Sequence, residues 1–206
     1  MGKNDSRPKL PKKLYDQIEQ DVVRLHIELK LSIPINPYYV AMKLGYIVRK
    51  YSELDLCESD LLQLRISDDG KPRDGLSYYD PNEETYVILV NDIDSFQKKH
   101  DEFTIMHEIA HIRMGHKTSS QLAEMIANYY ASYALIPSPL PMMFECSDFS
   151  DLIDIFDVSI ECAWYSWDRY INWYNYSGSY KNHEKRLKEY YTRITEESAY
   201  DKKLIK

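Results

Sequence analysis

The chain has 206 residues, of which 44% are hydrophobic and 29% are charged, so it can bury one good core and has an ordinary charge content. Its net charge of −7 argues against a general nucleic-acid-binding surface, which needs a basic face to replace counterions. Cys57, Cys146 and Cys162 are widely spaced and form no CxxC pair, which argues against a disulfide framework or a cysteine zinc site. No apolar run approaches the roughly 18 residues of a membrane span, so we expect a cytoplasmic protein without membrane contact.

The first part of the chain predicts helices. Residues 1–11 are expected to form a flexible tail. From Lys12 apolar residues recur every three or four positions, which predicts an amphipathic helix that ends before Pro34. Asn36 and Pro37 then supply an N-cap and a first-turn proline for a short helix, and Gly45 supplies its end.

The next part predicts a small meandering sheet. Apolar and polar residues alternate through 62–66, which favours a half-buried strand. A loop at 67–74 leads to residues 75–79. After a turn at 80–82, residues 85–90 form a further strand rich in Val, Ile and Leu.

The helix that follows the sheet carries the sequence His-Glu-x-x-His. An apolar stripe supports a helix over residues 103–114, which Gly115 ends in a left-handed cap. His107 and His111 lie one turn apart on one face and can reach one metal ion, with Glu108 beside them. A metal held by two imidazoles and a carboxylate keeps a position open for water and lowers its pKa, and a nearby carboxylate can take the proton. This pattern predicts a hydrolase.

A third metal ligand must come from another element, because the helix ends just after the second histidine. The next helical stretch is 121–136, with Ser120 as N-cap and Pro137 closing it. Glu124 projects from its first turn. Asn128 lies four residues later on the same face, placed to bind a ligand or its neighbour.

These two stretches resemble a known family. The run Phe-Thr-x-x-His-Glu-x-x-His-x-x-x-Gly-His from Phe103, followed by Glu-x-x-Ala-Asn-x-x-Ala-x-x-x-Ile-Pro from Glu124, resembles the ImmA/IrrE family of zinc metallopeptidases. The resemblance implies one Zn²⁺ per chain, held by His107, His111 and Glu124, with Glu108 as general base. Weaker similarity extends over residues 36–170.

The chain departs from the family at two places. The residues before Phe103 are His100, Asp101 and Glu102, where members usually carry basic residues, and Ile126 stands where a Glu is common. Neither departure touches an implied ligand, but both are expected to change substrate preference.

The resemblance also implies the architecture. We expect an α+β, zincin-like fold with a small, mostly antiparallel sheet packed on the metal-binding helix and with mainly helical N- and C-terminal parts. By the same resemblance, residues 46–51 form the first strand. The expected division is a metallopeptidase core at 12–137 and a helical extension packed on it at 138–206.

Zinc peptidases of this type commonly flank the cleft with an edge strand that holds an extended substrate. By resemblance that strand is formed by Gly75, Leu76, Ser77, Tyr78 and Tyr79. The alternative is that these residues are only a structural hairpin.

The last part of the chain predicts helices again. A short helix over residues 152–156 precedes a longer one capped by Ser159, and a charged, solvated helix covers 181–193. The pattern of two helices joined by a turn suggests DNA binding. However, the acidic side chains of Glu161 and Asp168 stand where DNA phosphates would lie, and only Arg169 is basic. We therefore expect no direct contact with nucleic acid.

The remaining histidines are expected outside the ligand set. His116 is interpreted as structural or solvent-facing, and His100 could line the cleft. His26 and His183 lie in charged stretches and are expected to be solvated.

The predicted activity is zinc-dependent cleavage of peptide bonds. The resemblance implies that the substrate is a helix-turn-helix repressor, often encoded by a neighbouring gene on a phage or mobile element and cut at one site. The alternatives are a metal-binding module that sequesters a regulator without proteolysis, and a toxin, antitoxin-type or structural protein encoded with a partner. Glu108 favours chemistry, because sequestration needs no general base.

Overall fold

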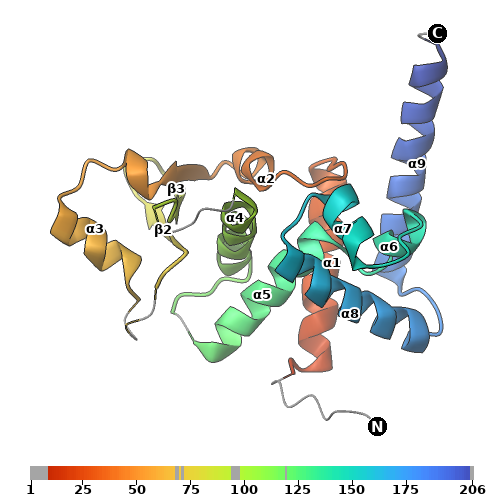
Figure 1. The fold of residues 1–206 in the computed structure, drawn as a ribbon, viewed down its shortest axis with the longest axis horizontal. Helices are drawn as coiled ribbons and strands as arrows, with labels where there is room; N and C mark the ends of the chain where they lie inside the picture. The colour runs from red at the N-terminus through yellow and green to blue at the C-terminus, as the bar shows by residue number, and fades with distance from the viewer. Residues whose placement is uncertain (1–8, 68–69, 71, 94–97, 119, 205–206) are drawn as a thin grey trace.

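The computed structural model describes residues 9–67, 70, 72–93, 98–118 and 120–204, so most of the predicted N-terminal tail lies outside the described residues. A helical body carries a small mixed sheet at one end, and the expected α+β class is confirmed (Figure 1). The helices are α1 (Lys12–Glu28), α2 (Pro37–Lys43), η1 (Tyr51–Glu53), α3 (Glu58–Arg65), α4 (Lys98–Arg113), α5 (Gln121–Leu135), α6 (Leu140–Met143), α7 (Phe149–Phe156), α8 (Ile160–Tyr176) and α9 (Asn182–Leu204). The strands are β1 (Ile47–Lys50), β2 (Gly75–Asp80) and β3 (Thr85–Val90).

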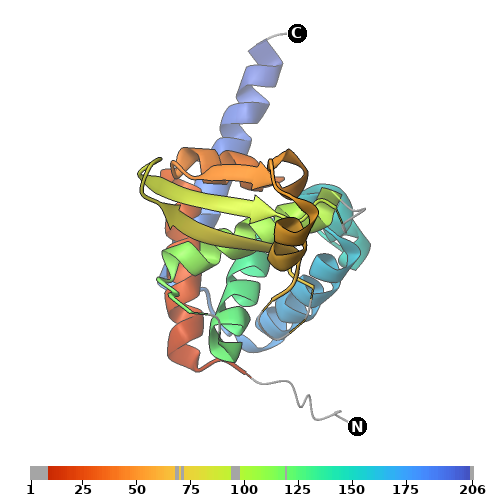
Figure 2. The same ribbon diagram turned by 90° about the vertical axis from the view of Figure 1, so that its left-hand side faces the viewer.

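The sheet has the order β1-β3-β2, with β1 parallel and β2 antiparallel to the central strand β3. Because side chains alternate along β3, Ile88 and Val90 join the main core with α4, while Val87 and Leu89 face the other side. The sheet therefore lies between α3 and α4 (Figure 1), and Figure 2 views it face-on. In this arrangement β2 is an edge strand that packs on α4, the helix that carries the His-Glu-x-x-His sequence.

The strand predicted at 62–66 is wrong, because residues 58–65 form helix α3. Leu61 and Leu64, three residues apart, both pack on the outer face of the sheet, so the helical period satisfies the burial. Leu62, which the strand interpretation placed on the same buried face as Leu64, is instead exposed. The acidic first turn also suits a helix N-terminus.

The predicted N-caps and the glycine at the end of the metal-binding helix agree with the structure, whereas α4, α7 and α9 are longer than predicted. Asn36, Ser120 and Ser159 each accept a hydrogen bond from the backbone N–H three residues later, as N-caps do. Gly115 follows the end of α4 and has a φ of +68°, a left-handed conformation that glycine adopts at low cost.

Helix α8 is attached to α5 by Arg169. The guanidinium Nη1 donates to the Ser132 hydroxyl at 2.8 Å, and Nη2 donates to the Ile136 carbonyl at 2.6 Å. The bond to Ile136 satisfies a carbonyl at the C-terminal end of α5, which the helix itself leaves unpaired. The helix that carries Glu124 is thereby held against the C-terminal part of the chain.

The two histidines predicted to be solvated are buried. His26 lies between α1, α5 and α9, with Nδ1 2.7 Å from the Tyr191 hydroxyl and Nε2 2.9 Å from the Ala134 carbonyl oxygen. His183 lies 3.1 Å from the Glu19 carboxylate. Both positions were misread because their partners lie on helices far away in the sequence. None of the described helices combines the length and apolar character needed to cross a membrane.

Candidate metal centre

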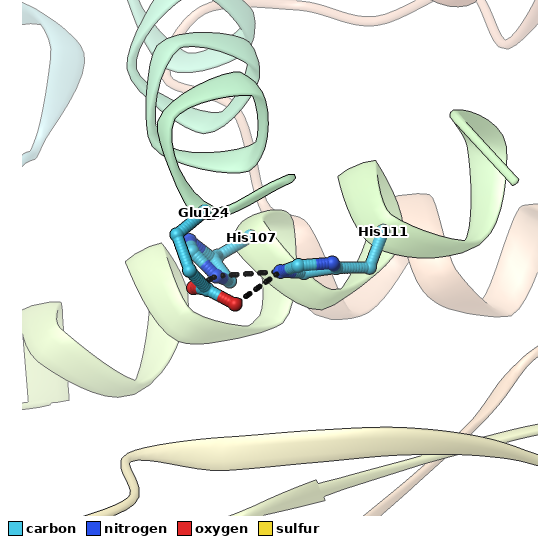
Figure 3. Close-up of side chains that lie close together, drawn as sticks. All are labelled: His107, His111 and Glu124. Atoms are coloured by element: carbon cyan, nitrogen blue, oxygen red, sulfur yellow. Dashed lines mark hydrogen bonds and ion pairs between the residues drawn. The ribbon is translucent and has the colours of Figure 1, made fainter. Parts of the chain in front are cut away.

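Helix α4 presents two imidazoles on the face toward α5, and α5 presents a carboxylate to them (Figure 3). His107 Nε2 lies 3.0 Å from His111 Nε2 and 3.2 Å from Glu124 Oε2, and His111 Nε2 lies 3.6 Å from Glu124 Oε1. One ligand atom from each residue falls within 4.8 Å of the others. The helical period explains the two histidines, and the packing of α5 across α4 brings in Glu124.

The outer nitrogens of both imidazoles have partners. His107 Nδ1 lies 3.0 Å from Asn128 Oδ1, and His111 Nδ1 lies 3.0 Å from His116 Nδ1. A proton on each Nδ1 of the α4 pair satisfies these contacts and leaves both Nε2 lone pairs directed at Glu124. Burial, followed by the neighbouring His107, lowers the pKa of His111 to about 4, which keeps this imidazole neutral.

This donor set fits a divalent metal. Two Nε2 lone pairs and a carboxylate at these separations repel one another unless a cation lies among them, and imidazole with carboxylate suits zinc. Among the described residues a second group, Glu19, His183 and Glu184, also meets the distance criterion. There the Lys181 ammonium already lies 2.7 Å from Glu19 Oε2, so that group is an internal ion-pair network.

Glu108 faces β2 rather than α5. Its carboxylate accepts a 2.7 Å hydrogen bond from the Ser77 hydroxyl of the edge strand. Burial raises the pKa of Glu108, and the Ser77 hydrogen bond opposes the rise. A carboxylate whose pKa is raised is a stronger base than an ordinary one, and its protonated form can return the proton.

The close approach of β2 to α4 depends on Gly75. A Cβ at this position would lie 2.6 Å from Thr104 Cγ2 and 2.8 Å from the Leu89 carbonyl oxygen. Only glycine fits between the helix and the neighbouring strand, and this brings Ser77 within reach of Glu108.

The structure brings most of the predicted site residues together. Residues 75–79, however, alternate between the two faces of the sheet, and only some of them face α4. His107, Glu108, His111, Glu124 and Asn128 form one constellation. Gly75 and Ser77 face α4, and Tyr79 packs edge-on against Tyr86, with ring centroids 5.5 Å apart. Leu76 packs on the far face with α3, and Tyr78 is exposed.

One neighbour of the site was not assigned this place from the sequence. His116 contacts His111 because the chain turns back after Gly115, with the His116 backbone N–H donating to the His111 carbonyl at 3.0 Å. The Gly-His pair after the helix was the available signal. His100 lies apart from the ligand atoms and pairs with Asp74, which precedes β2, at 3.1 Å.

A small mixed sheet lying on a helix with this constellation defines a metallopeptidase-type domain. Residues 57–141 match the family model Peptidase_M78, described as the IrrE N-terminal-like domain. The resemblance seen in the sequence is confirmed over this range, which includes α3, β2, β3, α4 and α5. No curated protein and no solved structure gives a significant match to the chain.

Proposed function

We propose that this protein is a zinc-dependent endopeptidase whose substrate is a helix-turn-helix repressor. The observation that carries the peptidase proposal is the convergence of His107, His111 and Glu124 beside a buried Glu108 in a domain of a peptidase family. The repressor, and its encoding on a phage or mobile element, rest on the sequence resemblance to ImmA/IrrE proteins.

The residues divide the work as follows. His107, His111 and Glu124 would hold the metal, and Asn128 and His116 orient the two imidazoles through their outer nitrogens. A divalent metal bound by this set would supply a Lewis acid and would lower the pKa of a bound water molecule.

Glu108 moves the proton. Ser77 holds one carboxylate oxygen, Oε2, and the other oxygen takes a proton from the attacking water. The water oxygen bonds to the scissile carbonyl carbon, the C–N bond breaks, and Glu108 returns the proton to the leaving amine. Because Ser77 belongs to the edge strand, a peptide added to β2 would lie beside this carboxylate.

The test is cleavage of the helix-turn-helix regulator encoded beside this gene, followed by intact-mass spectrometry. The zinc-loaded wild type is expected to cut it at one site, and Glu108→Gln, which cannot accept a proton, is expected to retain zinc without cutting. Glu189→Gln, at an exposed position of α9, is the matched control and should cut like the wild type. Stable binding without cleavage by the wild type would instead favour the sequestration alternative.

A further inference from the structure

Helix α8 carries an exposed apolar stripe beside its buried face. The α8 stripe consists of Ile160, Trp164, Trp167, Ile171 and Tyr174, which recur at intervals of four, three, four and three residues. Ile160, Trp164 and Tyr174 are 69%, 53% and 60% exposed, while Trp167 packs partly on the core. This interval pattern is that of a helix seam that packs against a second helix.

Acidic side chains border one flank of the α8 stripe. Glu161 and Asp168 each follow a stripe residue by one position, so they lie along the same flank seven residues apart, and both are exposed. The one basic residue of α8, Arg169, is turned inward onto Ser132 and Ile136. The flank is therefore negative, and a complementary helix carries Lys or Arg beside its apolar residues.

One end of the stripe lies beside His100, in the first turn of α4. A cavity of about 430 Å³ is lined by His100, Ser159, Ile160, Glu161, Trp164 and Tyr165. His100 precedes His107 by seven residues, or two helical turns, on the same face of α4, a distance of roughly 10 Å along the axis. An extended peptide covers this distance in about three residues. In Figure 1, α8 begins near α4 and α5 and runs away from the sheet.

We propose that the α8 stripe is the docking surface for a basic amphipathic helix of the protein substrate, and that the cavity beside His100 passes the adjoining extended segment toward the metal centre. This inference rests on the proposed function and adds to it a recognition element. It places the scissile bond a few residues beyond one end of the docked helix. The Arg169 contacts to the end of α5 keep this surface fixed relative to the helix that carries Glu124.

A second copy of the chain fits the stripe less well. In a two-fold arrangement each α8 faces another α8, so acidic flanks meet acidic flanks with no exposed Lys or Arg on the helix to pair with them. Like charges across a helix seam oppose association. We therefore expect the full chain to be a monomer in sedimentation analysis.

The docking surface can be tested with peptides that need no cleavage. The probes are two fluorescein-labelled helical peptides with Leu at the seam positions, one with Lys and the other with Glu at the flanking positions, and binding is followed by anisotropy. The Lys-flanked peptide is expected to bind about tenfold or more tightly than the Glu-flanked one, with a difference that shrinks at high salt. The double substitution Glu161→Lys with Asp168→Lys should reverse the preference.

Matched variants separate the stripe from the rest of α8. Trp164→Ala should weaken binding of the Lys-flanked peptide about tenfold or more, as loss of a central tryptophan anchor does. Tyr176→Ala removes an aromatic ring that is 83% exposed on the same helix but off the stripe, and it should leave binding unchanged. Circular dichroism checks that both variants are folded.

Several results would overturn the docking proposal: equal affinity for the two peptides, no binding of either, or unchanged binding by Trp164→Ala. A wild-type dimer that Ile171→Asp dissociates would assign the stripe to a second copy instead. All binding is measured with Glu108→Gln in the presence of EDTA, so failure here leaves the peptidase proposal standing. Failure of the cleavage test likewise leaves the binding result standing.

Discussion

At the scale of single residues, the contact between His111 and His116 is expected to fix the orientation of the His111 imidazole toward the proposed metal. When His111 carries its proton on Nδ1, as metal binding through Nε2 requires, His116 Nδ1 accepts it, and without His116 the His111 ring loses this partner. His116→Ala is expected to weaken zinc binding by about 10–100-fold, measured by competition with a chelating dye. His116→Asn places an amide oxygen near the lost nitrogen and should recover part of the affinity.

His100→Ala is the control for this prediction, because His100 pairs with Asp74 and contacts none of the ligand atoms. It should leave zinc affinity unchanged. Wild-type zinc affinity in His116→Ala would show that His116 does not orient His111.

His26 predicts a pH dependence of stability. Burial lowers the pKa of His26 to about 4, whereas in the unfolded chain the value is near 6.5. The contribution of neutral His26 to the free energy of unfolding is fully present above pH 6.5. It is lost as the pH falls from 6.5 toward 4, because the unfolded state takes up the proton first. At about 1.4 kcal/mol per pKa unit, the loss is up to roughly 3 kcal/mol.

The check is urea unfolding at several pH values in EDTA, so that metal binding does not contribute. His26→Gln keeps a donor and an acceptor for Ala134 and Tyr191 but does not titrate in this range. Its free energy of unfolding should fall less steeply with decreasing pH than that of the wild type. Parallel curves for the two proteins would contradict the assignment.

At the scale of elements, the sequence correctly predicted those helices and strands whose local apolar pattern matches the residues that the fold buries. The caps at Asn36, Ser120 and Ser159 and the apolar run at 85–90 were read correctly because each signal acts within a few residues. Helix α3 was misread because a short stretch with Leu61, Leu62 and Leu64 fits both periods, and the sheet that it covers decides between them. The parallel pairing of β1 with β3 likewise depends on contacts distant in sequence.

The approach of β2 to α4 can be tested at Gly75. In Gly75→Ala the new methyl group would meet Thr104 Cγ2 and the Leu89 carbonyl, and the latter is backbone that moves only with β3. Overpacking of this kind costs about 1–3 kcal/mol of unfolding free energy, measured by urea denaturation. We also expect slower peptide hydrolysis, because displacement of β2 moves Ser77 away from Glu108.

Adding Thr104→Ser to Gly75→Ala removes the clash with the side chain and keeps the hydroxyl that bonds the His100 carbonyl. The double variant should recover only part of the stability, because the clash with Leu89 remains. Full wild-type stability of Gly75→Ala alone would mean that β2 can shift freely.

At the scale of the whole molecule, the candidate site was predictable where one helix supplies it and less so where several helices meet. His107, Glu108 and His111 follow from spacing on α4, and Glu124 from its place in the next helix. The contacts of Ser77, His116 and Arg169 with the site or its supporting helix depend on how β2, the chain after Gly115 and α8 pack. The same packing buries His26 and His183, which a single-helix interpretation places in water.

The packing of α4 against α5 gives a prediction for the whole fold. The candidate ligands come from both helices, so a metal among them links the helices and stabilises the folded state by mass action. At zinc concentrations about 100 times the dissociation constant, the gain is about 2.7 kcal/mol, which corresponds to a rise in melting temperature of roughly 5–10 °C for a chain of this size. Thermal unfolding with zinc and with EDTA measures it.

Variants identify which residues carry this zinc-induced rise in melting temperature. Glu124→Ala should abolish most of it, because Glu124 is the only proposed ligand from α5, whereas Asn128→Ala should reduce zinc affinity by only about 10–100-fold. Glu108→Gln, which faces β2 and Ser77, should retain the full rise. If Glu124 served only as a favourable acid in the first turn of α5, its loss would lower the melting temperature equally with and without zinc. An undiminished zinc-induced rise in Glu124→Ala would therefore move the third ligand elsewhere, with His116 as the next candidate because it already contacts His111.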